Sequence, residues 1–303
     1  MTTSASRTVL LTGATGYIAS QLLPTFRQRY TMRLADVRDT DRDGHVVQGT
    51  RVVNLASDDD AAVRPLFSGA DTVVHLAYNR PSNANLNPQT GFMTRGYVDE
   101  RVNVDMAQRV FQLAMEEGVR RVVMASSNHA ADWYEHIIHP GLMDVVDPDR
   151  TPPKSDNYYG WAKLAYEALG FMFATGANGR VVENVQVRIG APRPIEAKSF
   201  FPNGPGTAGD AVRYRRDLGA YISPRDLTQL FVKSIETEDI RNEHGIPWQA
   251  FYGISNNARA FWSIVNARKV IGYAPEDDAE LKFADEIREY LVNPARAIEV
   301  PAT

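Results

Sequence analysis

The chain has 303 residues, of which 44% are hydrophobic, so it can bury the core of one large domain or of one domain with a small appendage. It has no cysteine, which excludes disulfides and thiolate metal sites, and its formal net charge of -4 argues against nucleic acid as a partner. No apolar run is long enough to cross a membrane, and no apolar signal core precedes the first predicted strand, so we expect a cytoplasmic protein without membrane contact.

Residues 7–12 form a short, β-branched apolar run, and a glycine-rich turn and a helical pattern follow it directly. This order suits a pyrophosphate, because bare backbone can approach the phosphates and the N–H groups at the helix start point at them. The third position of the fingerprint holds a small alanine, which lets the helix pack on the strand. The sequence therefore predicts a dinucleotide site at the turn Gly13-Ala14-Thr15-Gly16-Tyr17-Ile18-Ala19.

Residues 32–36 are predicted to form the second strand, which ends in Asp36. A carboxylate at this place accepts hydrogen bonds from the adenosine ribose hydroxyls and repels a 2′-phosphate, so NAD is favoured over NADP, although Arg38 lies close by. Residues 51–55 are predicted to form a third strand. Its end, with Asn54 and Leu55, should flank the adenine.

Residues 71–77 read as a fourth, buried strand that ends in His75-Leu76-Ala77. Strands that alternate with helices predict an α/β fold with a Rossmann-type, doubly wound parallel sheet, whose ligand binds at the carboxyl ends of the strands. His75 is a possible catalyst, but we prefer a packed, hydrogen-bonded histidine at the end of a buried strand. Residues 78–95 are expected to form a loop beside the cofactor.

A helix is predicted from about residue 97 to 117, ended by Gly118. Asn103 in its second turn is either buried, with a backbone kink or an ordered water near Lys163 as its partner, or exposed. The fifth strand, residues 120–125, leads into Ser126-Ser127-Asn128-His129 at the catalytic rim of such a sheet. Serine hydroxyls there can hold a substrate hydroxyl; the alternative is a turn with capping serines.

Tyr159 and Lys163 lie four residues apart in a predicted helix, so both side chains can meet the same bound molecule. A phenol titrates near about 10 and is a poor base at neutral pH, but a fixed cation beside it favours the phenolate. Such a pair also arises often by chance, and the upstream pattern is what favours a catalytic pair here.

The last third is predicted to cover the active site. Residues 190–209, rich in Pro and Gly, read as an irregular cover rather than a linker between independent domains. The run Val212-Arg213-Tyr214-Arg215-Arg216 either contributes to an anion site or forms a solvated basic face. We therefore divide the chain into an NAD-binding part that carries the catalytic residues, 1–190, and a smaller substrate-binding part, 191–303, that is not an independent domain.

Further elements are predicted as helices at about 226–237, 261–271 and 279–292, with a strand at 248–254. The last helix should pack Leu281, Phe283, Ile287 and Leu291 on one side. His136 and His139 lie three residues apart but have no third partner at ligand spacing, so we expect no metal site.

Taken together, these residues resemble the extended short-chain dehydrogenase/reductase family, also called the NAD-dependent epimerase/dehydratase family. The match spans roughly residues 7 to 190, and Asn54 stands where many members have Asp. Within this family, the sequence is similar in its details to the uronate dehydrogenases and to the haloarchaeal NAD-dependent glucose-6-phosphate dehydrogenases. The segments that carry this likeness include Ala125-Ser126-Ser127-Asn128-His129, Tyr159-Gly160-Trp161-Ala162-Lys163, Val187-Arg188-Ile189-Gly190 and Tyr221-Ile222-Ser223-Pro224-Arg225-Asp226.

The resemblance implies a dehydrogenase that oxidises C1 of a uronate, such as glucuronate or galacturonate, to the lactone. It implies Tyr159 as base, Lys163 as its electrostatic partner and Ser127 as holder of the reacting oxygen. Asn128 and His129 would contact the sugar, and Arg216, chosen among Arg213, Arg215 and Arg216, would grip the anion. The implied NAD contacts are Gly13, Thr15, Gly16, Tyr17, Ile18, Asp36, Asn54, Leu55, Leu76, Ala77, Asn103, Tyr159, Lys163 and Ile189.

Several alternatives stay open. Serines that uronate dehydrogenases place after the His-Leu-Ala and Arg-Ile-Gly segments are missing here, where Arg80 and Ala191 stand nearby, so the substrate can also be glucose 6-phosphate or another aldose. A nucleotide-sugar epimerase or dehydratase and a non-catalytic NAD sensor are the rival readings. The resemblance further implies a homo-oligomer, paired through the helices that hold Asn103 and Tyr159.

Overall fold

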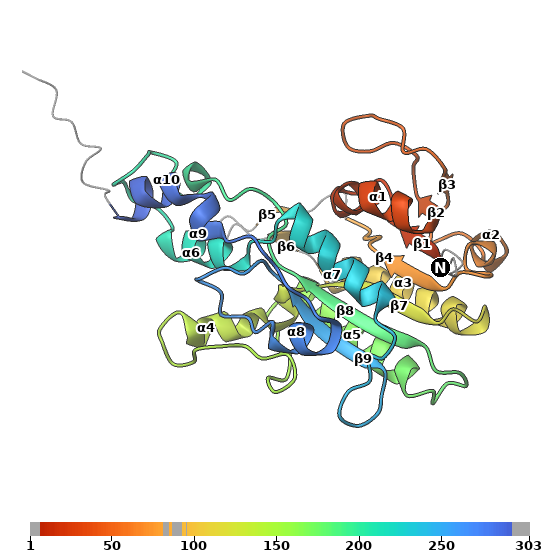
Figure 1. The fold of residues 1–303 in the computed structure, drawn as a ribbon. Helices are drawn as coiled ribbons and strands as arrows, with labels where there is room; N and C mark the ends of the chain where they lie inside the picture. The colour runs from red at the N-terminus through yellow and green to blue at the C-terminus, as the bar shows by residue number, and fades with distance from the viewer. Residues whose placement is uncertain (1–6, 81–84, 87–92, 95, 293–303) are drawn as a thin grey trace, which may run out of the picture.

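The computed structural model describes residues 7–80, 85–86, 93–94 and 96–292. Its main sheet has seven parallel strands in the order β3-β2-β1-β4-β7-β8-β9, which confirms the predicted doubly wound α/β fold (Figure 1). The strands are β1 (Thr8–Thr12), β2 (Thr31–Asp36), β3 (Thr50–Val52), β4 (Thr72–His75), β7 (Arg121–Ser127), β8 (Glu183–Ile189) and β9 (Trp248–Gly253).

A short antiparallel pair, β5 (Asn85–Leu86) and β6 (Met93–Thr94), lies in the segment predicted as a loop. The rest of that prediction, residues 81–84, 87–92 and 95, falls outside the described residues. The helices are α1 (Tyr17–Arg29), α2 (Asp60–Val63), α3 (Tyr97–Glu116), α4 (Glu135–Ile138), α5 (Tyr158–Ala174), α6 (Ala211–Ala220), α7 (Pro224–Glu236), α8 (Val265–Ile271), α9 (Ala279–Lys282) and α10 (Ala284–Ile287). Short helical turns are η1 (Arg64–Leu66), η2 (Asn128–Tyr134), η3 (Ala197–Ser199) and η4 (Arg288–Val292).

Helices cover both faces of the sheet, and β1 shows how the sequence produces this. Successive side chains of a strand point to opposite faces. Val9 and Leu11 pack in the core under α1 and α7, whereas Leu10 packs in the core under α3 and α5. Both faces of the central strands are therefore buried, which explains why their sequences are apolar runs without alternation.

A third apolar core lies beyond the carboxyl ends of the strands, where α4, α6, α9 and α10 gather at one end of the molecule (Figure 1). It joins Tyr134 of η2 to Tyr214 of α6 and Ile287 of α10. The C-terminal third also supplies β9 and α7 to the main sheet and its cover. The division at residue 190 stays a prediction.

Three predicted elements differ from the structure. β3, predicted over residues 51–55, ends at Val52. The helix predicted over residues 261–271 begins only at Val265, because the backbone at Trp262 instead pairs with Val146 as an isolated bridge. The predicted last helix is broken at Phe283, whose ring packs edge-on against Tyr221 at 5.2 Å between centroids. Leu281, predicted to be buried, is 80% exposed. No helix in the described part of the chain is both long and apolar enough to span a membrane.

The turn between β1 and α1 depends on Gly13. Its φ of +73° is in the left-handed region that favours glycine, and its amide donates to the carbonyl oxygen of Ala35 at 2.9 Å. A Cβ at this position would lie 2.6 Å from the backbone nitrogen of Ala77. The end of β4 therefore approaches so closely that no side chain fits.

We expect Gly13→Ala to be clearly more destabilising than Gly44→Ala. Gly44 has a similar φ of +86°, but a Cβ there meets nothing within 4 Å. Gly44→Ala should lower the free energy of unfolding by about 1 kcal/mol, through backbone strain alone. Gly13→Ala should lower it by about 3 kcal/mol, through the same strain together with the backbone clash. Urea unfolding of both variants measures the difference, and equal losses would contradict the close approach.

His75 is a packed histidine, as the sequence analysis preferred. It is 1% exposed, and its Nδ1 lies 2.7 Å from the hydroxyl oxygen of Thr12. Burial, together with the charge of Lys163, lowers the pKa of His75 to about 3. The folded protein therefore holds His75 neutral at pH values where the unfolded chain would protonate it.

The pKa of His75 is lower in the folded than in the unfolded state, so its contribution to the free energy of unfolding is complete above the unfolded pKa. We expect this contribution to fall as pH decreases from about 6.5 towards 3. His75→Gln should flatten the pH dependence of the unfolding free energy in that window. His45→Gln is the matched control, because the His45 side chain is 81% exposed. Unchanged slopes in the His75 variant would show that another group causes the acid sensitivity.

Candidate active site

Helix α5 carries Tyr159 and Lys163, and its first turn is fixed to its surroundings. The side chain of Asn157 caps the helix by accepting from the Gly160 amide at 2.9 Å. A Cβ on Gly160 would lie 2.2 Å from the carbonyl oxygen of His129, so the turn packs directly against the start of η2. Tyr159 is consequently brought next to His129, with ring centroids 5.6 Å apart.

The Lys163 ammonium is buried at the end of β7. It donates to the carbonyl oxygen of Ala125 at 3.0 Å, and its side chain is almost completely enclosed. Three aromatic rings surround it, with the ammonium 5.3 Å from the centroid of Tyr78, 5.5 Å from that of Tyr159 and 4.4 Å from that of Tyr166. Such cation–π contacts hold the charge in place beside the Tyr159 phenol.

In the polar run at the end of β7, Ser126, Ser127 and Asn128 are buried, whereas His129 is partly exposed. Ser126 donates to Glu167 at 2.8 Å, on the α5 side of the sheet. Ser127 instead caps η2 by accepting from the backbone amide of His129 at 3.2 Å, which agrees with the capping interpretation, while its role as holder of a substrate hydroxyl stays a prediction. Asn128 is 1% exposed, and its amide nitrogen has no hydrogen-bond partner in the described part of the chain. An unsatisfied buried donor of this kind suits a ligand oxygen.

His129 is oriented by an acid that the sequence analysis did not single out. The Nδ1 atom of His129 lies 3.0 Å from Oδ2 of Asp132, and the same oxygen accepts from the side-chain amide of Asn157 at 2.6 Å. The carboxylate therefore links the rim of β7 to the cap of α5. A fixed imidazole presents its Nε2 atom in a defined direction.

Glu167, one turn beyond Lys163, forms a buried ion pair with Arg188 of β8. Two hydrogen bonds of 2.8 and 2.7 Å join the side chains, and Arg188 also donates to the hydroxyl of Tyr252 at 3.0 Å. Burial acts to lower the pKa of Arg188, but the Glu167 charge raises it overall. The pair thereby joins α5, β8 and β9 directly beneath the rim.

The glycine turn has the features that a dinucleotide needs. Gly16 is the N-cap of α1, and no side chain caps this helix. The carboxylate of Asp36 accepts from the backbone and hydroxyl of Thr15 at 2.9 and 2.8 Å, at the carboxyl end of β2. Bare backbone, helix-end amides and an acid at the strand end thus lie together, which fits a pyrophosphate with its adenosine ribose. The individual contacts predicted for NAD stay predictions.

Asn103 is fully buried, and its side chain forms two hydrogen bonds with the backbone of Asn79. Its oxygen accepts from the Asn79 amide at 2.7 Å, while its nitrogen donates to the Asn79 carbonyl at 3.2 Å. The nearby buried Glu100 accepts from the hydroxyl of Tyr78 at 2.6 Å. Asn103 therefore holds the segment after β4 in place, with the Tyr78 ring against Tyr159 at 5.8 Å.

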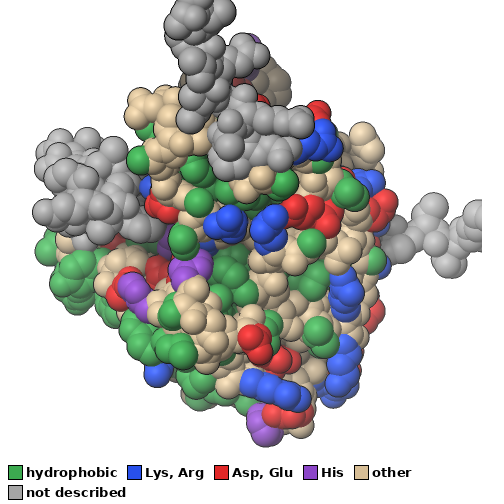
Figure 2. All heavy atoms as spheres, turned by 90° about the vertical axis from the view of Figure 1, so that its left-hand side faces the viewer, with side chains coloured by type: hydrophobic (Ala, Val, Ile, Leu, Met, Phe, Trp, Pro, Cys, Tyr) green, Lys and Arg blue, Asp and Glu red, His purple; other side chains and the backbone are tan. Residues whose placement is uncertain are grey.

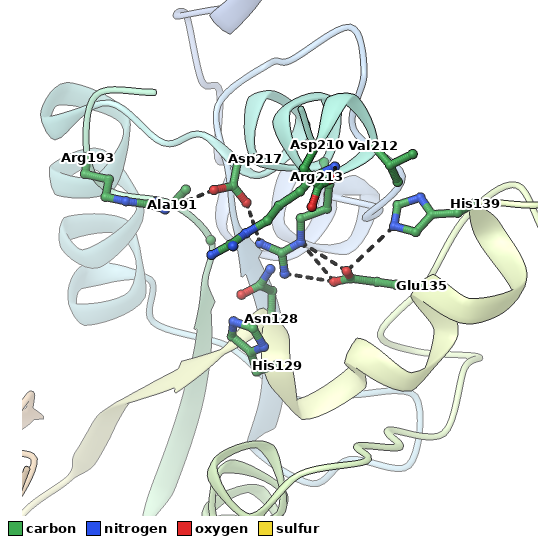
Figure 3. A pocket seen from close by; sticks show the side chains of 12 residues that line it. Asn128, His129, Glu135, His139, Ala191, Arg193, Asp210, Val212, Arg213 and Asp217 are labelled. Carbon is green, nitrogen blue, oxygen red and sulfur yellow. Dashed lines mark hydrogen bonds and ion pairs between the residues drawn. The ribbon is translucent and has the colours of Figure 1, made fainter. Parts of the chain in front are cut away.

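A cavity of about 430 Å³ opens beside the rim, between η2, the end of β8 and α6 (Figure 3). Three arginines and three acids line it, together with two histidines. Figure 2, a view of this end of the molecule, shows histidine side chains beside a group of Lys and Arg side chains. The lining residues include Asn128, His129, Glu135, His139, Arg193, Asp210, Arg213, Arg216 and Asp217.

Arg216 lines this cavity but is already paired with acids, and its predicted role of gripping an anion stays a prediction. It donates to Glu135 at 2.8 and 3.1 Å and to Asp217 at 3.1 Å, and only 11% of its side chain is exposed. Although burial alone would lower it, these carboxylates raise the pKa of Arg216. Arg213 also lines the cavity, whereas Arg215 is not among the lining residues.

Sequence reasoning missed Glu135, His139, Arg193 and Asp217. None of them stands in a motif, and Glu135 meets Arg216 across 81 residues of sequence. His139 was considered above only as a metal ligand, and its Nε2 atom lies 3.8 Å from the Oε2 atom of Glu135. In the described part of the chain the one cluster with ligand spacing is Asp41, Asp43 and His45, on the segment after β2. The expectation of no metal stays a prediction.

Proteins of known family resemble this chain along most of its length. The family described as NAD dependent epimerase/dehydratase matches residues 9–182. The NAD-dependent glucose-6-phosphate dehydrogenase of Haloferax volcanii is 32% identical, over 92% of this chain and 97% of that protein. The uronate dehydrogenase of Pseudomonas syringae pv. tomato is 27% identical, over 90% of this chain and 83% of that protein. The crystal structure of a glucuronic acid dehydrogenase from Chromohalobacter salexigens has the same fold, with a TM-score of 0.68 and 23% identity over 94% of this chain and 89% of that one.

Proposed function

Because this chain belongs to the NAD-dependent epimerase/dehydratase family and takes NAD as its cofactor, we propose that it is a sugar dehydrogenase that oxidises C1 of a free hexuronate to the lactone. The observation that carries the proposal is the Tyr159–Lys163 pair on α5 at the end of β7, with the Tyr159 ring beside His129, which lines a cavity together with three arginines. A protein that only sensed NAD would have no need for this arrangement.

Tyr159 acts as the base in this proposal and takes the proton of the C1 hydroxyl. The charge of Lys163, held by Ala125 and by the surrounding rings, favours the ionised phenol. Ser127 holds the C1 oxygen and stabilises it as the lactone carbonyl forms. Bound NAD supplies the hydride acceptor. The unpartnered amide of Asn128 and the oriented ring of His129 contact the sugar hydroxyls.

The cavity suits a monosaccharide better than a nucleotide sugar. Its volume of about 430 Å³ lies in the lower part of the range for small-ligand sites. The guanidinium groups of Arg193, Arg213 and Arg216 line the cavity, and guanidinium groups are favoured partners of carboxylates, although Arg193 and Arg216 already pair with acids of the lining. A sugar phosphate is the second candidate, because the relative in Haloferax volcanii is named for glucose 6-phosphate.

Incubation of the purified protein with NAD and a panel of uronates, neutral aldoses and sugar phosphates tests the proposal. We expect NADH absorbance to rise with glucuronate or galacturonate, and the lactone to be released. Turnover of a sugar phosphate alone would select the second candidate. An absence of net NADH with every sugar, combined with interconversion of nucleotide sugars, would replace the proposal with an epimerase.

Tyr159→Phe should lower kcat by a factor of about 10² to 10⁴, because general acid–base assistance of that size is lost while the ring is kept. NAD binding, measured by calorimetry, should change little. Tyr158→Phe is the matched control, because the neighbouring Tyr158 is about half exposed on the same helical turn. Near wild-type turnover in the Tyr159 variant would end its assignment as the base.

A further inference from the structure

The cavity wall contains a continuous row of alternating charges. Arg193 donates to Asp217 at 2.9 Å, Asp217 accepts from Arg216, and Arg216 donates to Glu135, which has His139 at its far side (Figure 3). Two guanidinium groups thus alternate with two carboxylates. The remaining arginine of the lining, Arg213, lies on α6 next to the third acid of the lining, Asp210, which caps that helix by accepting from the Arg213 backbone amide at 2.8 Å. With the histidines neutral, the formal charges of the lining cancel.

Arg216, at the centre of this row, is enclosed on several sides. Its Nε, Nη1 and Nη2 atoms all donate to carboxylates, so each nitrogen of the guanidinium is in use. The ring of Trp262 lies against the group, with the guanidinium carbon 5.2 Å from the ring centroid. An anion that approaches Arg216 therefore also approaches Glu135 and Asp217, which repel it.

We propose that Glu135 is a specificity-determining residue that screens Arg216 and selects sugars by their charge. This proposal rests on the sugar 1-dehydrogenase function given above. Repulsion by Glu135 is absent for a neutral sugar, moderate for a carboxylate with one negative charge, and about twice as large for a phosphate with two. The cavity therefore accepts neutral and singly charged sugars and rejects sugar phosphates.

The choice of Glu135 over Asp217 follows from their positions. Asp217 is shared between Arg193 and Arg216, so its charge is compensated from two sides. Among the described residues, Glu135 forms side-chain hydrogen bonds with one guanidinium only, through both of its oxygens, and it lies on α4, opposite α6 across the cavity. Removal of its charge leaves Arg216 with one carboxylate and available to an anion.

Three sugars that share one ring and differ in charge at C6 provide the test: glucose, glucuronate and glucose 6-phosphate. In Glu135→Gln, kcat/KM should stay within a factor of two for glucose, rise about 5-fold for glucuronate and rise about 25-fold for glucose 6-phosphate, as expected for charges roughly 6 Å apart in a solvated pocket. Glu135→Asp, which keeps the charge, should preserve the wild-type order. Glu289→Gln, an exposed acid on η4, is the control for a general change in net charge.

Equal changes for all three sugars in Glu135→Gln would overturn the proposal, because a purely structural role predicts no dependence on charge. A second measurement does not depend on turnover. Calorimetric titration with inorganic phosphate should show binding to Glu135→Gln about 25-fold tighter than to the wild type and to Glu135→Asp, whichever reaction the protein catalyses. No gain in phosphate affinity would also overturn it, whereas a gain without any sugar oxidation would refute only the proposed function.

Discussion

The buried ion pair of Glu167 and Arg188 fixes α5, the helix that carries the proposed catalytic residues Tyr159 and Lys163, against the sheet. Both side chains are almost fully enclosed, and removing either partner would leave a charge buried without compensation, which costs about 3 to 5 kcal/mol in proteins. The pair thereby fixes α5 on the neighbouring strands, and the Ser126 hydroxyl adds β7 to the same carboxylate. Because Lys163 lies one turn before Glu167 and Ser127 directly follows Ser126, the spacing of these two proposed catalytic residues follows from this contact.

The two sides of the candidate site are built in different ways. The cofactor side consists of backbone: a glycine turn, an uncapped helix start and a strand end, all of which belong to the regular sheet. The proposed sugar side is the cavity lined by side chains of η2, α4 and α6, and these three elements pack in a separate apolar core beyond the strand ends. Substitutions on the sugar side can therefore alter specificity without disturbing the sheet.

The sequence predicted most accurately those features that depend on neighbouring residues. The strand–glycine–helix order at Gly13 and the four-residue spacing of Tyr159 and Lys163 are local patterns, and both correspond to the observed elements. The pairing of Arg216 with Glu135 could not be predicted, because it depends on how two distant short helices meet over the sheet. The helix predicted over residues 279–292 is present as α9, α10 and η4, but it is interrupted at Phe283, whose ring packs against Tyr221 of a distant segment.

The place of β9 has a consequence for how such a chain can be divided. This strand comes from the C-terminal third, yet it pairs with all of β8 except its first residue, from Asn184 beside Trp248 to Ile189 beside Gly253. A fragment that stops after residue 190 would leave β8 as a bare edge with unpaired amides and carbonyls, a surface on which other chains aggregate. Chimeras designed to exchange the proposed sugar-binding segments between relatives should therefore replace the stretches around α4 and α6 and keep β9 from the same protein as β8.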